Sequence, residues 1–129
     1  MDLAMAKSSL VVAGCVEEWV QKPISDFTAK RKDGLVHNRM AIFGGVKNRE
    51  VLMGQLREVL VSLNVKQVNL FAHEDCLAYA ARKFASRDLE TEALQNDLRN
   101  TRAAICAETP KLKVRAFILT KKQKILEVE

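Results

Sequence analysis

The sequence is poor in aromatic residues and proline, and it has no long apolar run. Among 129 residues there are five Phe, one Trp, one Tyr and two Pro. The core is therefore expected to consist mainly of Leu, Val, Ile and Ala. The longest clearly apolar run, Leu10 to Val16, is far shorter than the roughly 20 residues needed to cross a bilayer, so no membrane span is predicted.

Cysteine is also scarce, which excludes a disulfide-stabilised scaffold. The three cysteines are an odd number and too few for such a framework. Reduced thiols in a cytosolic protein and thiolates bound to a metal both remain open. The apolar content of 48% and the mixed signs of the charged residues argue against low-complexity disorder. The length suits one compact domain.

No export signal is recognisable in the first residues. Val12-Ala13-Gly14-Cys15 resembles a bacterial lipoprotein cleavage box, but Asp2 accompanies Lys7 in the segment before it. The apolar stretch before the cysteine is also shorter than the 7–15 residues of a signal peptide. We therefore predict a cytoplasmic protein in which residues 1–8 are a flexible leader and residues 9–129 are the domain.

A net charge of +5 raises the question of nucleic-acid binding. The densest basic groups, within residues 30–32 and 111–124, lack the interleaved aromatic pattern of a stacking surface for single strands. A solvated basic surface is the favoured interpretation, and nucleic acid is not expected as a partner.

Strand-like and helix-like segments alternate along the chain. A continuous apolar run predicts a buried strand at residues 9–15. Further strands are expected at residues 39–43, 66–72 and 112–119, and an antiparallel edge strand at 124–128. Residues 16–22 are expected to be a polar connection. Helices are expected from Pro23 to just before 32–34, over 51–63, over 75–84, and over 88–107 with Leu94, Leu98 and Ile105 inward. This alternation predicts an α/β domain of three layers, with a mostly parallel sheet between helices.

Polar residues follow two of the predicted strands, where sites form in parallel sheets. Cys15 ends the first strand, and His73 and Cys76 follow the third with the spacing H-x-x-C. If these strands are neighbours, two thiolates and an imidazole converge in a donor set that suits Zn²⁺. The alternative is that the cysteines are buried apolar residues and the histidine caps a turn. Cys106, flanked by Ala in a helix, is interpreted as a packing residue.

With these motifs the chain resembles the β-class carbonic anhydrases, especially their short bacterial and archaeal branch. That family has C-x-D-x-R after its first strand and H-x-x-C after its third; here the segments are CVEEW (15–19) and HEDC (73–76). IFGG (42–45) stands at the family's Asn-Ala-Gly turn, where Gly44-Gly45 is expected to form a tight turn.

The resemblance covers residue 9 to the end of the chain and carries several implications. It implies the sheet order 2-1-3-4 with the last strand antiparallel at the edge. It also implies Zn²⁺ held by Cys15, His73 and Cys76, carbon dioxide or bicarbonate as the small-molecule substrate, and a homodimer. It does not identify substrate-binding residues.

Two departures from the family pattern concern the chemistry. In the family the arginine holds the aspartate off the metal, so that water occupies the fourth position and attacks carbon dioxide. Here Glu17 and Trp19 replace that pair. Leu77 replaces the glycine after the second cysteine, which is expected to narrow the approach to the metal. Glu17 is the predicted catalytic residue beside the water. Without an arginine, however, it can coordinate the ion and close a Cys₂HisGlu site.

Three hypotheses follow. The protein is a carbonic anhydrase, a zinc lyase, or it is a catalytically impaired relative whose closed zinc site stabilises a binding domain. In the third, it acts on small sulfur analogues of carbon dioxide. Whether it is an enzyme stays open at this point. His37 is either a proton shuttle or a loop histidine, and Asp75 either supports His73 or caps a helix.

Overall fold

The computed structural model describes residues 7–79 and 84–129, in which strands and helices alternate along the chain. The strands are β1 (Ser9–Gly14), β2 (Val36–Ala41), β3 (Val65–His73), β4 (Lys113–Leu119) and β5 (Ile125–Val128). The α-helices are α1 (Glu18–Ala29), α2 (Arg49–Ser62) and α3 (Arg87–Glu108), and the short 3₁₀ helices are η2 (Gly45–Asn48) and η3 (Leu77–Tyr79).

All five strands form one sheet in the order β2-β1-β3-β4-β5. The pairs β1–β2, β1–β3 and β3–β4 are parallel, and β5 runs antiparallel to β4 at the edge. All of β1 and the last seven residues of β3 are buried, as expected for the central strands of a parallel sheet, and β1 accordingly appears in the sequence as a continuous apolar run. The predicted fold class and strand order are confirmed.

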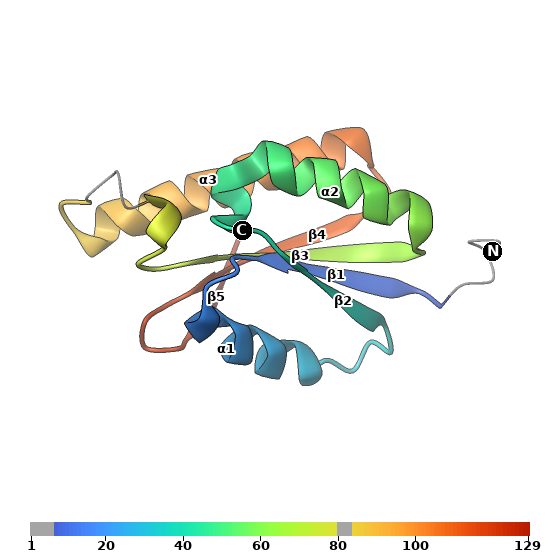
Figure 1. The fold of residues 1–129 in the computed structure, drawn as a ribbon, viewed down its shortest axis with the longest axis horizontal. Helices are drawn as coiled ribbons and strands as arrows, with labels where there is room; N and C mark the ends of the chain where they lie inside the picture. The colour runs from blue at the N-terminus through green and yellow to red at the C-terminus, as the bar shows by residue number, and fades with distance from the viewer. Residues whose placement is uncertain (1–6, 80–83) are drawn as a thin grey trace.

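Helices cover both faces of the sheet, as Figure 1 shows, with α2 and α3 on one face and α1 on the other. Successive residues of β1 alternate between the two cores, because side chains along a strand point to opposite faces. Val11 and Ala13 belong to the core under α2 and α3, whereas Leu10 and Val12 belong to the core under α1.

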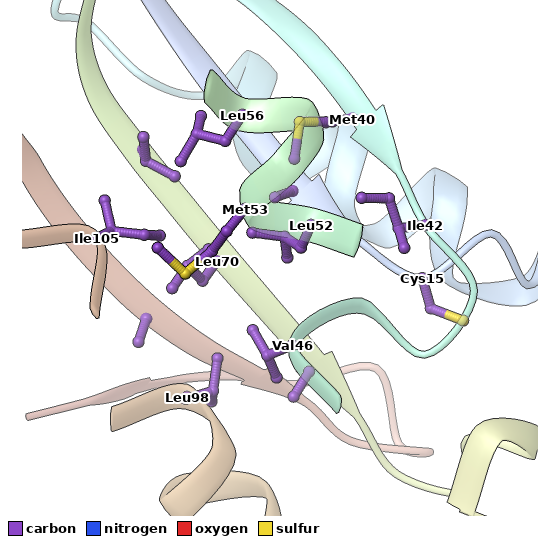
Figure 2. Packing of buried hydrophobic residues seen from close by; sticks show 14 of the residues in the cluster. Cys15, Met40, Ile42, Val46, Leu52, Met53, Leu56, Leu70, Leu98 and Ile105 are labelled. Carbon is purple, nitrogen blue, oxygen red and sulfur yellow. The ribbon is translucent and has the colours of Figure 1, made fainter. Parts of the chain in front are cut away.

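The larger core is made of aliphatic side chains from both helices and the sheet. Leu52 and Leu56 of α2 and Leu98 and Ile105 of α3 pack around Leu70 of β3 (Figure 2). The predicted inward positions of α3 are thus confirmed. Among the described residues, no helix has both the length and the apolar character needed to cross a membrane.

The prediction that helix α1 begins at Pro23 is wrong. The helix begins at Glu18, inside the segment expected to be a polar connection, and Pro23 lies in its interior. A proline there removes one backbone hydrogen bond and costs about 3 kcal/mol. Val20 and Ile24 lie one helical turn apart and are buried against the sheet, and this burial offsets the cost.

Two other boundaries differ from expectation. Strand β2 covers Val36–Ala41 rather than 39–43, because its limits are set by pairing with β1 and not by its own side chains, of which only Met40 is buried. Of the helix expected over 75–84, the described part is only the 3₁₀ turn Leu77–Tyr79; residues 80–83 of that prediction lie outside the described residues.

The core between α3 and the sheet provides a first prediction. Replacing Leu98, which is fully buried, by alanine should lower the free energy of unfolding by about 2–5 kcal/mol because it leaves a cavity. Leu89 lies on the same helix but is 50% exposed, so Leu89→Ala should change stability by about 0.5 kcal/mol or less. Urea denaturation of the two variants measures the difference, and equal losses would contradict this packing.

Candidate metal centre

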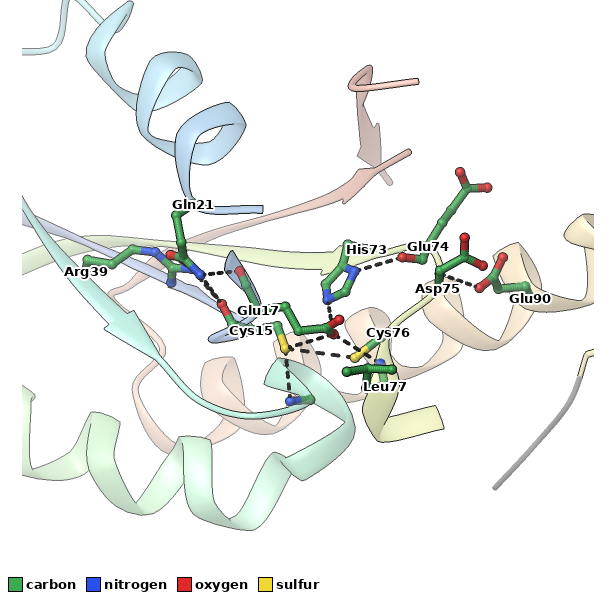
Figure 3. A network of polar contacts seen from close by, with 11 residues as sticks. Cys15, Glu17, Gln21, Arg39, His73, Glu74, Asp75, Cys76, Leu77 and Glu90 are labelled. Atoms are coloured by element: carbon green, nitrogen blue, oxygen red, sulfur yellow. Dashed lines mark hydrogen bonds and ion pairs between the residues drawn. The ribbon is translucent and has the colours of Figure 1, made fainter. Parts of the chain in front are cut away.

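Four side chains converge where β1 and β3 end. Cys15 follows the last residue of β1, His73 is the last residue of β3, and Cys76 and Glu17 lie in the turns beyond these strands. Because β1 and β3 are neighbours, the two strand ends lie side by side (Figure 3). One ligand atom from each side chain lies within 4.8 Å of the other three. The structure therefore brings together the four residues singled out in the sequence.

The distances between these donor atoms suit one tetrahedral ion. The two sulfurs are 3.9 Å apart, Glu17 Oε2 is 3.5 Å from Cys15 Sγ, and the same oxygen is 3.1 Å from His73 Nε2. Ideal zinc bond lengths of about 2.3 Å to sulfur and 2.0–2.1 Å to nitrogen or oxygen give tetrahedral edges of about 3.8, 3.6 and 3.4 Å. The donor set and its spacing thus fit Zn²⁺.

The ring of His73 is held in the tautomer that a metal ligand needs. Its Nδ1 is 2.8 Å from the carbonyl oxygen of Glu74. A carbonyl only accepts, so Nδ1 carries the hydrogen and Nε2 presents a lone pair. Nε2 is buried and has no hydrogen-bond partner among the described residues; the Glu17 oxygen 3.1 Å away is close but lacks hydrogen-bond geometry. A cation between these two acceptors would satisfy both.

The two thiols are electrostatically different. Contact with the Cys76 thiol, together with His73 and the backbone N–H groups of Glu17 and Gly44, outweighs burial and lowers the pKa of Cys15 far below its ordinary value. Contact with Cys15, and then burial, raises the pKa of Cys76. The metal-free pair thus holds one thiolate and one thiol, and a bound cation would take the place of the remaining proton.

His73 titrates at a higher pH than a free imidazole. Burial lowers its pKa, but the neighbouring Cys15 sulfur, the hydrogen bond to the Glu74 carbonyl and the nearby Glu17 carboxylate raise it by more.

Gly44 shapes the wall of the site opposite His73. Its backbone is left-handed (φ 83°), and its N–H donates to Cys15 Sγ at 3.3 Å. A Cβ at this position would lie 2.8 Å from the Cβ of Ala78, so only glycine fits without movement. The expected tight turn with close backbone approach is confirmed.

Trp19 packs against His73 and, unlike an arginine, has no charge to offer Glu17. The two rings meet edge to face with centroids 5.1 Å apart, and Lys121 Nζ lies 4.5 Å from the Trp19 centroid. Within the described part of the chain, no arginine forms an ion pair with Glu17. Its Oε2 accepts instead a hydrogen bond from the backbone N–H of Leu77 at 3.1 Å.

Two residues that the sequence analysis missed hold the backbone of the Cys15–Glu17 turn. Gln21 Nε2 donates to the carbonyl oxygens of Cys15 (2.9 Å) and Glu17 (2.8 Å). Arg39 Nη2 donates to the Cys15 carbonyl (3.0 Å) and to Gln21 Oε1 (3.1 Å). No motif marks these residues, because they act through backbone oxygens that only the fold brings within reach.

Three other candidates lie outside the cluster. His37 is in strand β2, not in a loop, and pairs with Leu10 in the amino half of β1, away from the strand ends that carry the site. The Asp75 carboxylate is bound by Arg87 and caps no helix among the described residues. Cys106 is partly exposed on α3 and is not one of the clustered residues.

Known structures share this fold at low sequence identity. No family model and no curated protein matches the sequence. The carbonic anhydrase from Streptococcus mutans is 15% identical over 96% of this chain and 83% of its own, with a TM-score of 0.65. The β-carbonic anhydrase CafD of Aspergillus fumigatus is 11% identical over 100% and 94%, with a TM-score of 0.58.

A third similar structure supports the same conclusion about the fold. The β-carbonic anhydrase CcaA is 11% identical over 98% of this chain and 82% of its own, with a TM-score of 0.61. The chain therefore has the fold of the β-carbonic anhydrases, and it carries a Cys-Glu-His-Cys cluster at the carboxyl ends of its central strands.

The glycine at the wall of the site provides a second prediction. Gly44→Ala should lower the free energy of unfolding by at least about 1 kcal/mol, because alanine disfavours the left-handed conformation and its Cβ meets Ala78. Gly54 lies inside α2 with open space around it, so Gly54→Ala should raise stability by up to about 1 kcal/mol. Chemical denaturation of both variants tests the opposite signs; a stabilising Gly44→Ala would contradict this account.

Proposed function

We propose that this chain binds one Zn²⁺ through Cys15, His73 and Cys76, and that Glu17 competes with water for the fourth position. The observation that carries the proposal is the donor geometry. The Cys15–Cys76, Cys15–Glu17 and Glu17–His73 donor distances lie within about 0.3 Å of the edges of an ideal zinc tetrahedron. The orphaned Nε2 of His73 supports it, because a buried nitrogen with a free lone pair is what a metal ligand requires.

The proposed activity is the reversible hydration of carbon dioxide, as a zinc lyase. When bound, the ion supplies a Lewis acid that lowers the pKa of water in its fourth position. Glu17 is the proposed catalytic residue: its carboxylate lies beside that position and can accept a proton at Oε2. The backbone N–H of Leu77 orients this oxygen, and Gln21 holds the turn that carries it.

Glu17 also limits this activity. With no arginine among the described residues to hold it away, its Oε2 lies at ligand spacing from both Cys15 and His73, and the side chain is only 12% exposed. If Glu17 held the ion, hydration would require this carboxylate to move away from it, so the rate would scale with the fraction of molecules in which the fourth position is open. We therefore expect weak hydration activity in the unmodified protein.

A second function is a binding domain with a closed, structural zinc site. Three apolar residues next to the site in sequence are exposed: Val16 (47%), Phe43 (50%) and Leu77 (63%). Their proximity to the ligands favours contact of this face with another protein, and a second copy of the chain is the proposed partner. In either function the thiolate ligands suit a reducing compartment, and we propose a cytoplasmic location for the domain of residues 9–129.

Metal content is the third prediction. Protein purified without added metal should contain about one zinc per chain by plasma mass spectrometry, because four donors converge at ligand spacing. Cys15→Ser and His73→Ala should each reduce this content strongly. Cys106→Ser is the matched control and should leave it unchanged, since Cys106 is not in the cluster. Unchanged zinc in the first two variants would refute the assignment of the ligands.

The missing arginine provides the fourth prediction. Trp19→Arg should raise carbon dioxide hydration by tenfold or more, because a cation near Glu17 would hold the carboxylate off the ion. Trp19→Phe keeps an aromatic ring against His73 without adding charge, and it should leave the rate near that of the unmodified protein. Hydration is measured by stopped flow at equal zinc content. No rise for Trp19→Arg would instead favour the binding domain.

A further inference from the structure

A strained residue separates two of the proposed metal ligands. Asp75 lies between His73 and Cys76 with a backbone φ of 56°, in the left-handed region that residues other than glycine seldom adopt. If Asp75 relaxed to an ordinary conformation, the chain would change direction after His73. The distance between the His73 ring and the Cys76 sulfur therefore depends on groups that hold Asp75 in this conformation.

The first such group is the carboxylate of Glu90, in the first turns of α3. Glu90 is only 6% exposed, and its Oε2 accepts the backbone N–H of Asp75 at 2.8 Å. Figure 3 shows the Glu90 side chain directed at this segment from its helix. A buried carboxylate is costly unless it is paired and hydrogen-bonded, so its presence here ties α3 to the ligand segment.

The second group is Arg87, one turn earlier on the same helix. Its Nη1 donates to Glu90 Oε1 at 2.6 Å, and Nη1 and Nη2 donate to the two carboxylate oxygens of Asp75 at 2.8 and 3.1 Å. Arg87 Nε also lies 3.9 Å from Glu74 Oε2. One guanidinium thus joins both residues between the ligands to the buried carboxylate, with two-pronged geometry on Asp75.

We propose that Glu90 and Arg87 are positioning residues that hold the segment His73–Cys76 in its metal-binding conformation. Neither residue belongs to the donor cluster, so both act through Asp75. The inference rests on the proposed function, because it takes His73 and Cys76 as ligands. Loss of such supporting partners typically weakens metal affinity about 10–100-fold.

Arg87→Ala tests the proposal, because Arg87 is 53% exposed and its removal should not prevent folding. Arg57→Ala is the matched control: Arg57, on α2, is 56% exposed and pairs with Glu108 of α3 at 2.6 Å, outside the donor cluster. Co²⁺ is the probe, followed by its thiolate and d–d absorption. Arg87→Ala should weaken Co²⁺ binding about tenfold or more and alter the absorption, while Arg57→Ala stays within about twofold of the unmodified chain. Equal affinities for the two variants would overturn the proposal.

Hydrogen exchange of the Asp75 amide in the metal-free protein separates failure of this inference from failure of the metal site. If the unmodified chain gives no cobalt–thiolate absorption, the metal assignment fails. The positioning role of Glu90 and Arg87 is then judged by hydrogen exchange alone. The Asp75 amide should exchange slowly in the unmodified chain and in Arg57→Ala, and at least about tenfold faster in Arg87→Ala and Glu90→Gln. Equal exchange rates of the Asp75 amide in all four proteins would overturn the positioning role of Glu90 and Arg87, whatever the cobalt result.

Discussion

The parallel pairing of β1 with β3 is the contact on which the rest of the structure depends. It places residues 58 positions apart, Cys15 and His73, at adjacent strand ends, with Ala13 opposite Leu70 in the register. Both strands are buried between helix layers, so neither can shift without exposing a core face. The candidate site is therefore rigid on its strand side, and its adaptable parts are the turns that carry Glu17 and Cys76.

These two turns are held in different ways. The Cys15–Glu17 turn is held from α1 and β2, through Gln21 and Arg39, by hydrogen bonds to backbone oxygens. The His73–Cys76 segment is held from α3 by charged side chains that keep Asp75 left-handed. A cation at the centre would join both turns, so ion binding should stabilise the loops at the same time as it fills the site.

In the proposed metal site, Trp19 at the place of the arginine of the carbonic anhydrase motif would change the balance at the fourth position of the ion. An aromatic edge against His73 stabilises the ligand ring by packing, but it cannot attract a carboxylate. Glu17 is consequently oriented by the backbone N–H of Leu77 and by its contacts with Cys15 and His73. Under the proposal, Trp19 would therefore favour a well-ordered metal site and disfavour an open fourth position, and this difference separates the two proposed functions.

The sequence by itself determined the fold class, most strands and the four clustered side chains. The central strand β1 is a continuous apolar run, and Cys and His are few enough that their places after strands stand out, whereas Glu17 is singled out by its position in the motif that resembles the carbonic anhydrase family. Only the tertiary structure decided where α1 begins, because burial of Val20 and Ile24 outweighs the proline, and where β2 lies, because an exposed edge strand takes its limits from its neighbour. It alone also revealed Gln21, Arg39, Arg87 and Glu90, since hydrogen bonds between distant segments leave no local pattern in a sequence.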